Sequence, residues 1–195
     1  PKDALALRLI MKKRRLALSA EERASAFQKI LLQLFTLPEY RNAKYIAAYY
    51  GKTSAGEFDT LPLLKQILND KKILALPRVD SVSNRLILYQ VKNIGTDLEP
   101  GVFGLIEPKI SNPKISVEKL DLIIVPGLVF DHYGNRYGYG KGYYDGLLSP
   151  TSSNHFVKIA LALDSLVVDF ELIHSKKDIP MDFIITEKQK ITNLL

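Results

Sequence analysis

The segment 130–148, FDHYGNRYGYGKGYYDGLL, carries five of the eleven glycines and five of the ten tyrosines of the chain. Glycines allow backbone N–H groups to approach a bound anion closely and to point together into a concave nest. Arg136 and Lys141 add full positive charges, and the guanidinium of arginine matches the geometry of a phosphate group. A helix that begins in GYYDGLL would add the partial positive charge of its N-terminus. We therefore predict that this segment cradles a polyphosphate.

The glycine spacing differs from that of two common phosphate-binding motifs. A Walker loop has serine or threonine after its lysine, whereas Gly142 follows Lys141 here. The G-x-G-x-G spacing also differs from the dinucleotide fingerprint. The alternative is a flexible loop with exposed tyrosines. Such loops rarely combine regular glycines with an arginine, a lysine and a double tyrosine, so the phosphate interpretation is favoured.

Asp145 directly follows the predicted cradle, where a carboxylate would repel phosphate unless a cation lay between them. Mg²⁺ takes one or two protein carboxylates together with phosphate oxygens and water. Asp178 and Asp182, in KKDIPMD, are candidates for the second carboxylate, although a turn or a helix cap explains either one alone. The three histidines share no metal-binding spacing: His132, His155 and His174.

The loop TSAGEFDT (53–60) contains another group of polar residues, between an expected strand and an expected helix. Asp59 or Thr60 suits the cap of that helix. Glu57 has no such role, so it is the better candidate to face a ligand.

Strands that alternate with helices must position these residues. Helices are expected over 4–18, over a segment that starts with the capping box of Ser19 and Glu22, and over 59–70. Largely apolar strands are expected over 45–50, 72–79 (stopping at Pro77), 85–91, 121–127, 158–163 and 182–187. Continuous apolar strands indicate a sheet that is covered on both faces. The alternation predicts a layered α/β fold with a mostly parallel sheet, in which ligands bind beyond the carboxyl ends of the strands. The segment 92–116 lacks clear periodicity and is expected to be a working loop or a long connection.

Composition narrows the class of protein. The 195 residues fit one domain, and 47% of them are hydrophobic, which is enough for a core. The absence of cysteine excludes disulfides, thiol catalysis and cysteine metal sites.

No apolar run is long enough to cross a membrane and no signal peptide is visible, so we expect a cytoplasmic protein. The net charge of +6 favours anionic partners. The run KKRR at 12–15 is interpreted as one solvated helix face rather than a nucleic-acid patch.

The segment PGLVFDHYGNRYGYGKGYYD (126–145) resembles the signature of the 5-formyltetrahydrofolate cyclo-ligase family, whose members are also called 5,10-methenyltetrahydrofolate synthetases. The resemblance extends over essentially the whole chain, through RRLALSAEER, GEFDT, LPRV, EPGVFGLIEP and DIPMD. The central signature is specific, because we know no other family with its spacing of Arg, Gly, Lys, Tyr-Tyr and Asp. The outer segments alone would be weak.

The resemblance implies one domain over residues 1–195, with a three-layer α/β/α fold and a mostly parallel, Rossmann-like sheet. It implies a cytoplasmic, monomeric enzyme that uses ATP and Mg²⁺ to convert 5-formyltetrahydrofolate to 5,10-methenyltetrahydrofolate, with ADP and phosphate as the other products. In the family reaction, the γ-phosphoryl group of ATP moves to the formyl oxygen. N10 of the folate then closes the ring, and phosphate leaves. Nucleic acids and membranes are not among the implied partners.

The resemblance also assigns roles to residues by position. Lys141 and Arg136 would be catalytic, with Lys141 nearest the transferred group. ATP would contact Arg8, Arg136, Tyr137, Gly138, Tyr139, Gly140, Lys141, Gly142, Tyr143 and Tyr144. The folate would contact Tyr50, Glu57, Tyr139 and Tyr143, with Glu57 accepting hydrogen bonds from the pterin ring. Mg²⁺ would be bound by Asp145, with Asp178 as the second carboxylate.

The sequence departs from the family pattern at three positions, none of which removes a chemical group invoked in the signature. Ala4 stands where the family often has lysine, Tyr137 where leucine is commoner, and Gly146 where arginine is frequent. Two other classes of function are weighed against the cyclo-ligase. One is a binding module for nucleotide or folate that performs no catalysis, and the other, ranked far lower, is a basic nucleic-acid-binding protein.

Overall fold

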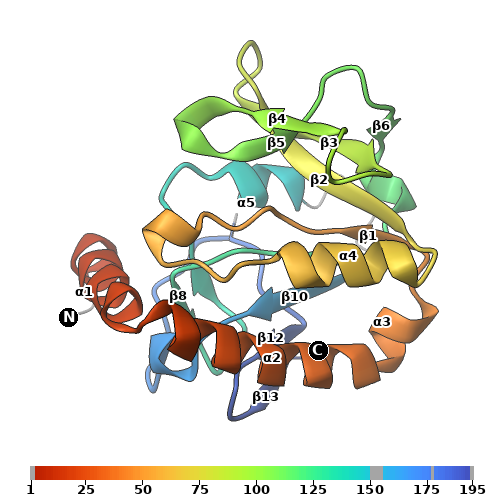
Figure 1. Ribbon diagram of the computed structural model, residues 1–195. Coiled ribbons are helices and arrows are strands. Elements are labelled where there is room, and N and C mark those ends of the chain that lie inside the picture. Colours follow the sequence, from red (N-terminus) through yellow and green to blue (C-terminus); the bar gives the residue numbers. More distant parts are fainter. Residues whose placement is uncertain (1–2, 150–155, 177, 194–195) are drawn as a thin grey trace.

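An eight-stranded sheet runs through the centre of the protein in the computed structural model, which describes residues 3–149, 156–176 and 178–193 (Figure 1). The strand order is β13-β12-β10-β7-β1-β2-β3-β6. The bounds are β1 Tyr45–Ala47, β2 Ile73–Asp80, β3 Arg85–Val91, β6 Lys114–Ile115, β7 Leu122–Ile124, β10 Val157–Leu161, β12 Phe183–Ile185 and β13 Lys190–Thr192. The five strands from β12 to β2 are parallel to one another, while β13, β3 and β6 pair antiparallel at the two edges. The prediction of an α/β fold with a mostly parallel sheet is confirmed.

The parallel strands are short and apolar because both of their faces are covered. In β7, for example, Leu122, Ile123 and Ile124 are all at most 1% exposed. The six expected strands are all present, with ends that differ by a few residues. The expectation that the second one stops at Pro77 is wrong, because β2 continues to Asp80. Its pairing with β1 ends at Ala75, so Pro77 lies where β2 has only β3 as a sheet neighbour and the missing N–H is tolerated.

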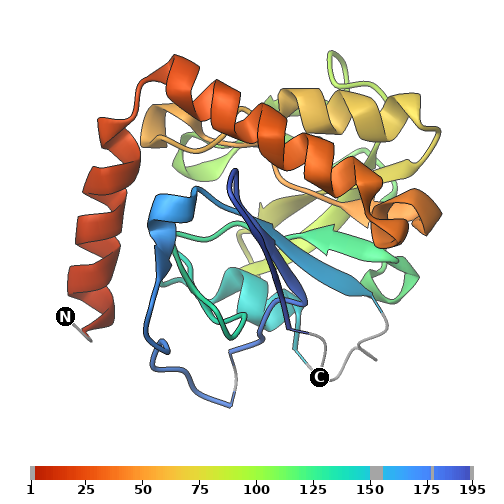
Figure 2. The same cartoon turned by 90° about the horizontal axis from the view of Figure 1, so that it is seen from below.

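Helices cover the sheet on both sides. Their bounds are α1 Ala4–Ala17, α2 Ala20–Thr36, α3 Pro38–Asn42, α4 Leu61–Asn69 and α5 Tyr143–Leu147. Figure 2 shows α2 and α4 on one side of the sheet and α5 on the other, with α1 standing at the edge between these layers. The predicted capping box is confirmed at the start of α2, where Ser19 Oγ accepts from the Glu22 N–H at 3.1 Å. None of the described helices is long and apolar enough to cross a membrane.

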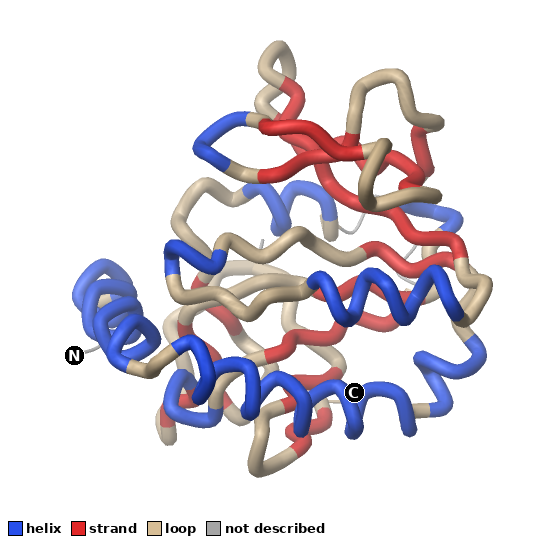
Figure 3. The backbone as a smooth tube through the Cα atoms, viewed as in Figure 1, coloured by secondary structure: helices blue, strands red, loops and turns tan. Residues whose placement is uncertain are grey.

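Two smaller sheets were not expected from the sequence, and Figure 3 shows their strands beside the main sheet. One contains β8 (Val129–Asp131), β9 (Arg136–Tyr137) and β11 (Val167–Val168). The other is a hairpin of β4 (Leu98–Pro100) and β5 (Ile106–Pro108), joined by a 3-10 turn at Val102–Gly104. The segment 92–116 is therefore partly a β-hairpin rather than a plain connection. Short 3-10 turns also lie at Thr53–Ala55, Val117–Lys119 and Asp164–Leu166.

Candidate active site

A cavity of about 510 Å³ lies beyond the carboxyl ends of the parallel strands. Tyr50 follows β1, Val79 lies near the end of β2, and Pro126 follows β7, and all three line the cavity. The volume is within the roughly 300–1,000 Å³ of typical small-molecule sites. Ligands of open α/β sheets generally bind at this position, beyond the carboxyl ends of the strands.

Every residue that the sequence assigned to ATP, folate or metal binding lines this one cavity. The set comprises Arg8, Tyr50, Glu57, the continuous run 136–145, and Asp178. Asp182, the other candidate for a second carboxylate, is not among the lining residues. Its Oδ2 instead lies 2.9 Å from Lys158 Nζ and accepts from the Lys158 N–H at 2.7 Å, so it holds β12 to β10.

The first half of the glycine-rich segment is structural. Asp131 is fully buried, and its Oδ1 accepts from the N–H groups of Tyr133 and Asn135, both at 2.9 Å. Gly134 has φ +85°, and a Cβ there would lie 2.5 Å from the Met181 carbonyl oxygen. Only glycine fits such a position, so this part of the motif fixes the turn that leads into the site.

The second half forms the glycine loop, residues 138–142, which faces the cavity. Gly140 has φ +87°, and the N–H groups of Tyr139, Gly140 and Lys141 donate no hydrogen bond to any of the described residues. Arg8 of α1 holds the loop from one side, because its Nε donates to the Gly138 carbonyl oxygen at 2.8 Å. Backbone donors without protein partners beside a cationic side chain suit a phosphate group.

Arg136 lies beneath the glycine loop and is paired with Asp145. The Arg136 Nη2 and Asp145 Oδ1 atoms are 2.8 Å apart, and the Arg136 side chain is only 4% exposed. A Cβ on Gly138 would lie 3.1 Å from Arg136 Nη1, which shows how closely the loop covers the guanidinium. Burial lowers the pKa of Arg136 from its usual value, and Asp145 opposes that shift. Because Arg136 Nε is also buried and has no partner among the described residues, this cation depends strongly on Asp145.

Lys141 extends from the glycine loop to the β4–β5 hairpin. Its Nζ lies 3.4 Å from the centre of the Phe103 ring, and the Phe103 carbonyl oxygen accepts from Lys52 Nζ at 2.6 Å. The hairpin therefore forms a wall of the cavity and contacts two cations that line it. The segment 92–116 has no periodic pattern, so the prediction there was a working loop or a long connection. Phe103, Leu105, Ile106 and Glu107 of this segment line the cavity.

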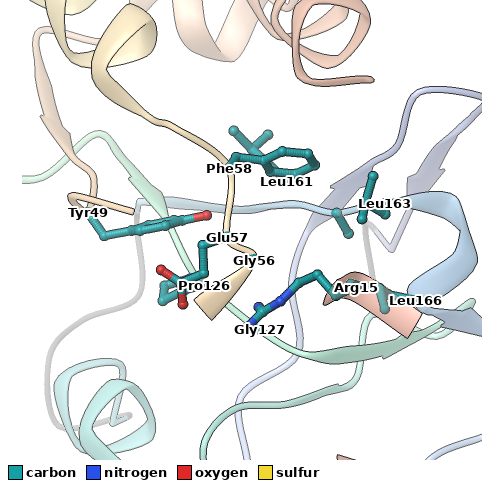
Figure 4. Close-up of a pocket in the computed structure, with 11 residues that line it drawn as sticks. Arg15, Tyr49, Gly56, Glu57, Phe58, Pro126, Gly127, Leu161, Leu163 and Leu166 are labelled. Atoms are coloured by element: carbon teal, nitrogen blue, oxygen red, sulfur yellow. The ribbon is translucent and has the colours of Figure 1, made fainter. Parts of the chain in front are cut away.

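Glu57 and Tyr139 form a second polar group in the cavity. The Tyr139 hydroxyl donates to Glu57 Oε1, and Glu57 Oε2 accepts from the Lys52 N–H at 2.7 Å. Burial, followed by the charge of Glu57, raises the pKa of Tyr139 above its usual value, so this phenol stays protonated at neutral pH. Burial likewise raises the pKa of Tyr49, which lies beside the same carboxylate (Figure 4).

The residues around Glu57 decide between two candidate caps and correct one expectation. Of the two candidates, Asp59 caps the start of α4, because its Oδ1 accepts from the Leu61 N–H at 3.0 Å. The Thr60 hydroxyl instead donates to the Tyr49 carbonyl oxygen at 2.7 Å and accepts from the Gly51 N–H, which closes the loop that presents Glu57. In the run KKRR, Arg15 is buried at 4% exposure, so the interpretation of all four side chains as a solvated face is wrong.

Carboxylates, not histidines, are the candidate metal ligands. Asp145 and Asp178 both line the cavity. Their negative charges both favour the charged form of Arg136 and so oppose the lowering of its pKa by burial. Within the described residues, no group of three or more His, Cys, Asp or Glu side chains could hold a metal ion by itself. Two carboxylates and phosphate oxygens would suffice for Mg²⁺. His132 and His174 lie near Asp169 and Glu171, and His155 is outside the described residues.

An α/β sheet with one large cavity beyond its parallel strands, lined by backbone donors, cations and carboxylates, is typical of an enzyme that acts on small molecules. Residues 2–187 match the 5-formyltetrahydrofolate cyclo-ligase family, and the chain belongs to that family. The family and the class of enzyme predicted from the sequence are thereby confirmed.

Individual relatives agree with this assignment. The chain is 32% identical over 162 residues to a 5-formyltetrahydrofolate cyclo-ligase of Mus musculus, covering 78% of this chain and 76% of the relative. It is 29% identical over 157 residues to that of Haemophilus influenzae, covering 80% and 83%. The solved structure of 5,10-methenyltetrahydrofolate synthetase from Aquifex aeolicus superposes with a TM-score of 0.84 at 35% identity, covering 97% of this chain and 92% of that one.

Proposed function

We propose that residues 1–195 act as one domain that converts 5-formyltetrahydrofolate to 5,10-methenyltetrahydrofolate, with ATP and Mg²⁺, giving ADP and phosphate. One observation carries the proposal. The residues with phosphate, folate and carboxylate–metal chemistry all line a single cavity. A reaction that transfers a phosphoryl group from ATP to folate needs both substrates side by side, and a continuous cavity provides this.

The chemical problem is that an amide oxygen is a poor leaving group. Transfer of the γ-phosphoryl group breaks its bond to the ADP oxygen and forms a bond to the formyl oxygen. N10 then attacks the formyl carbon and loses its proton to water, and the carbon–oxygen bond breaks to release phosphate. The released phosphate therefore carries the former formyl oxygen as one of its four oxygens.

At the ATP end, the protein supplies donors and positive charge to the phosphates. The free N–H groups of the glycine loop, the Arg8 guanidinium and Lys141 all lie at the cavity. Lys141 is exposed and its Nζ lies against the Phe103 ring, and it would leave that ring to reach the transferred group. Arg136 acts from beneath the loop as a fixed positive charge. Such electrostatic positioning provides most of the catalysis in phosphoryl transfer.

Asp145 and Asp178 would hold Mg²⁺ beside the phosphates. Their hard oxygen donors match the preference of this ion, and the adjacent phosphate would complete its ligands. When bound, Mg²⁺ neutralises charge on the phosphate oxygens. Asp145 Oδ1 also forms an ion pair with Arg136, so Asp145 would connect the Arg136 guanidinium to the metal position.

At the folate end, Glu57 would accept hydrogen bonds from N–H groups of the pterin. Tyr50, Tyr139 and Tyr143 would surround the flat pyrimidine half of the pterin, and apolar residues such as Val79 form the adjoining wall. Aromatic rings stack favourably with such a ring in an offset geometry. Tyr139 would then contribute to both ends, because its backbone N–H belongs to the glycine loop while its hydroxyl donates to Glu57.

The test is an absorbance assay for the methenyl product with the wild-type chain, Lys141→Ala and the control Lys65→Ala. Lys65 is exposed on α4 and does not line the cavity. We expect product with wild type and Lys65→Ala, and a loss of turnover of at least about a hundredfold in Lys141→Ala with an unchanged far-UV spectrum. Unchanged turnover in Lys141→Ala would remove the assigned role, and no product from folded wild type would refute the proposed function.

A further inference from the structure

Arg15 is a buried cation that the proposed reaction has not yet used. Its three neighbours in KKRR are exposed, whereas its own side chain lies 4% exposed at the inner side of α1. Its guanidinium forms no ion pair with any of the described residues. A buried charge that is not paired directly with a carboxylate costs stability. The position of Arg15 is therefore better explained by a role in the site than by stability.

The contacts of Arg15 lead to the folate end of the cavity. Its Nη2 donates to the Ala55 carbonyl oxygen at 2.7 Å and to the Tyr139 hydroxyl at 3.0 Å. The guanidinium carbon lies 5.7 Å from the centre of the Tyr139 ring. Arg15 thus joins three segments that are distant in the sequence: helix α1, the turn at Thr53–Ala55, and the glycine loop.

These contacts also fix the direction of the hydrogen bond from Tyr139. Arginine can only donate, so the Tyr139 hydroxyl accepts from Arg15 and must direct its single proton elsewhere. That proton is donated to Glu57 Oε1. The result is a one-way series of hydrogen bonds from Arg15 through Tyr139 to Glu57, and it leaves the carboxylate held in one orientation.

Arg15 and Glu57 also line the same small second cavity. This cavity has a volume of about 20 Å³ and is lined by Tyr49 as well, which is room for one water molecule. The Nε atom of Arg15 is buried and has no partner among the described residues. In Figure 4 the Arg15 side chain extends from its helix towards Glu57. The guanidinium therefore supports Glu57 through Tyr139 and lies next to it at this cavity.

We propose that Arg15 is a positioning residue that orients Tyr139 and Glu57 for the pterin ring of the folate substrate. The proposal rests on the proposed function, because it takes Glu57 as the pterin-binding carboxylate. Arg15 does not contact the substrate. Arg15 restricts the motion of Tyr139 and Glu57, which do contact it. Arg15 therefore affects the affinity for folate and leaves the affinity for ATP unchanged.

The experiment compares Arg15→Met and Arg15→Lys with the control Arg14→Met. Arg14 is the adjacent residue, is exposed, and donates to the Ser165 carbonyl oxygen outside the cavity. Arg15→Met should raise the KM for 5-formyltetrahydrofolate about tenfold or more, as expected for a lost hydrogen bond from a charged group. The KM for ATP should change less than about twofold. Arg15→Lys should recover part of the folate affinity, and Arg14→Met should behave as wild type.

The decisive comparison repeats the Arg15→Lys substitution in a Tyr139→Phe background, which also serves if Arg15→Met does not fold. Without the Tyr139 hydroxyl, Arg15→Lys should have little further effect on the folate KM. An unchanged folate KM in both Arg15 variants, or the same fold-change with and without the hydroxyl, would overturn the positioning role. Wild type that makes no methenyl product would instead refute the proposed function, so the two failures are distinguishable.

Discussion

The pair of Arg136 and Asp145 leads to an asymmetric prediction for stability. Asp145→Asn keeps the shape of the side chain but removes the only carboxylate that pairs with Arg136 among the described residues. Arg136 is 4% exposed and cannot rehydrate, whereas Asp145 is 29% exposed and can. Removing one partner from a buried pair costs about 3–5 kcal/mol, and the partial exposure of Asp145 reduces this to about 2–3 kcal/mol.

The same geometry predicts that a second substitution restores stability. In Arg136→Met/Asp145→Asn, no buried charge remains, and methionine fills a similar volume with a flexible apolar chain. We expect the double variant to recover at least about half of the loss, near 1 kcal/mol or more. Arg136→Met alone leaves a carboxylate that water can reach, so it should be less destabilising than Asp145→Asn.

The assay is urea denaturation at neutral pH, followed by far-UV circular dichroism because the chain has no tryptophan. Free energies of unfolding follow from linear extrapolation, with similar slopes required for all four proteins. A change below about 0.5 kcal/mol in Asp145→Asn, or a double variant less stable than Asp145→Asn, would show that the buried guanidinium is not held by this carboxylate.

Three further predictions concern the cavity and its surroundings. Gly140→Ala should lower the free energy of unfolding by about 1–2 kcal/mol and weaken ATP binding, because φ is +87° there. The control Gly146→Ala, within helix α5, should change neither quantity in urea denaturation and ATP titration. Equal effects of the two substitutions would show that the backbone conformation of Gly140 is not the cause. Glu57→Gln should raise the folate KM about tenfold or more with little change for ATP, measured in the product assay, and an equal rise for both substrates would contradict this assignment. Partial burial raises the pKa of Asp97, but hydrogen bonds from two backbone N–H groups and a threonine outweigh it, so the pKa lies below the usual value. Asp97→Asn should therefore lower the free energy of unfolding by about 1 kcal/mol at pH 7. That difference should shrink as the pH falls below about 4 and through the lowered folded-state pKa; a difference independent of pH would refute it.

Patterns that act locally were predictable from the sequence. The capping box, the apolar strands and the glycine-rich segment depend on neighbours along the chain, and each lies where it was expected. The placement of the site beyond the parallel strands followed from a general property of such sheets. Asp145 and Lys141 were identified because they lie within the glycine-rich segment itself.

The features that were missed depend on contacts between distant segments. Burial of Arg15 depends on Ala55 and Tyr139, which are 40 and 124 residues away, so its own segment shows only a basic run. The β4–β5 hairpin has strands of three residues each, too short for an alternating pattern. Lys52 joins the site through a carbonyl oxygen of that hairpin. The cytoplasmic location and the monomeric state stay predictions.

In the proposed reaction, the γ-phosphoryl group of ATP moves to the formyl oxygen in this cavity. The most direct measurement uses 5-formyltetrahydrofolate labelled with oxygen-18 in the formyl group, together with ATP, Mg²⁺ and the purified chain. Mass spectrometry of the released phosphate then reports where the label goes. We expect one oxygen-18 atom in each phosphate formed, in step with the methenyl product. Unlabelled phosphate formed together with that product would show that the phosphoryl group does not move to the formyl oxygen.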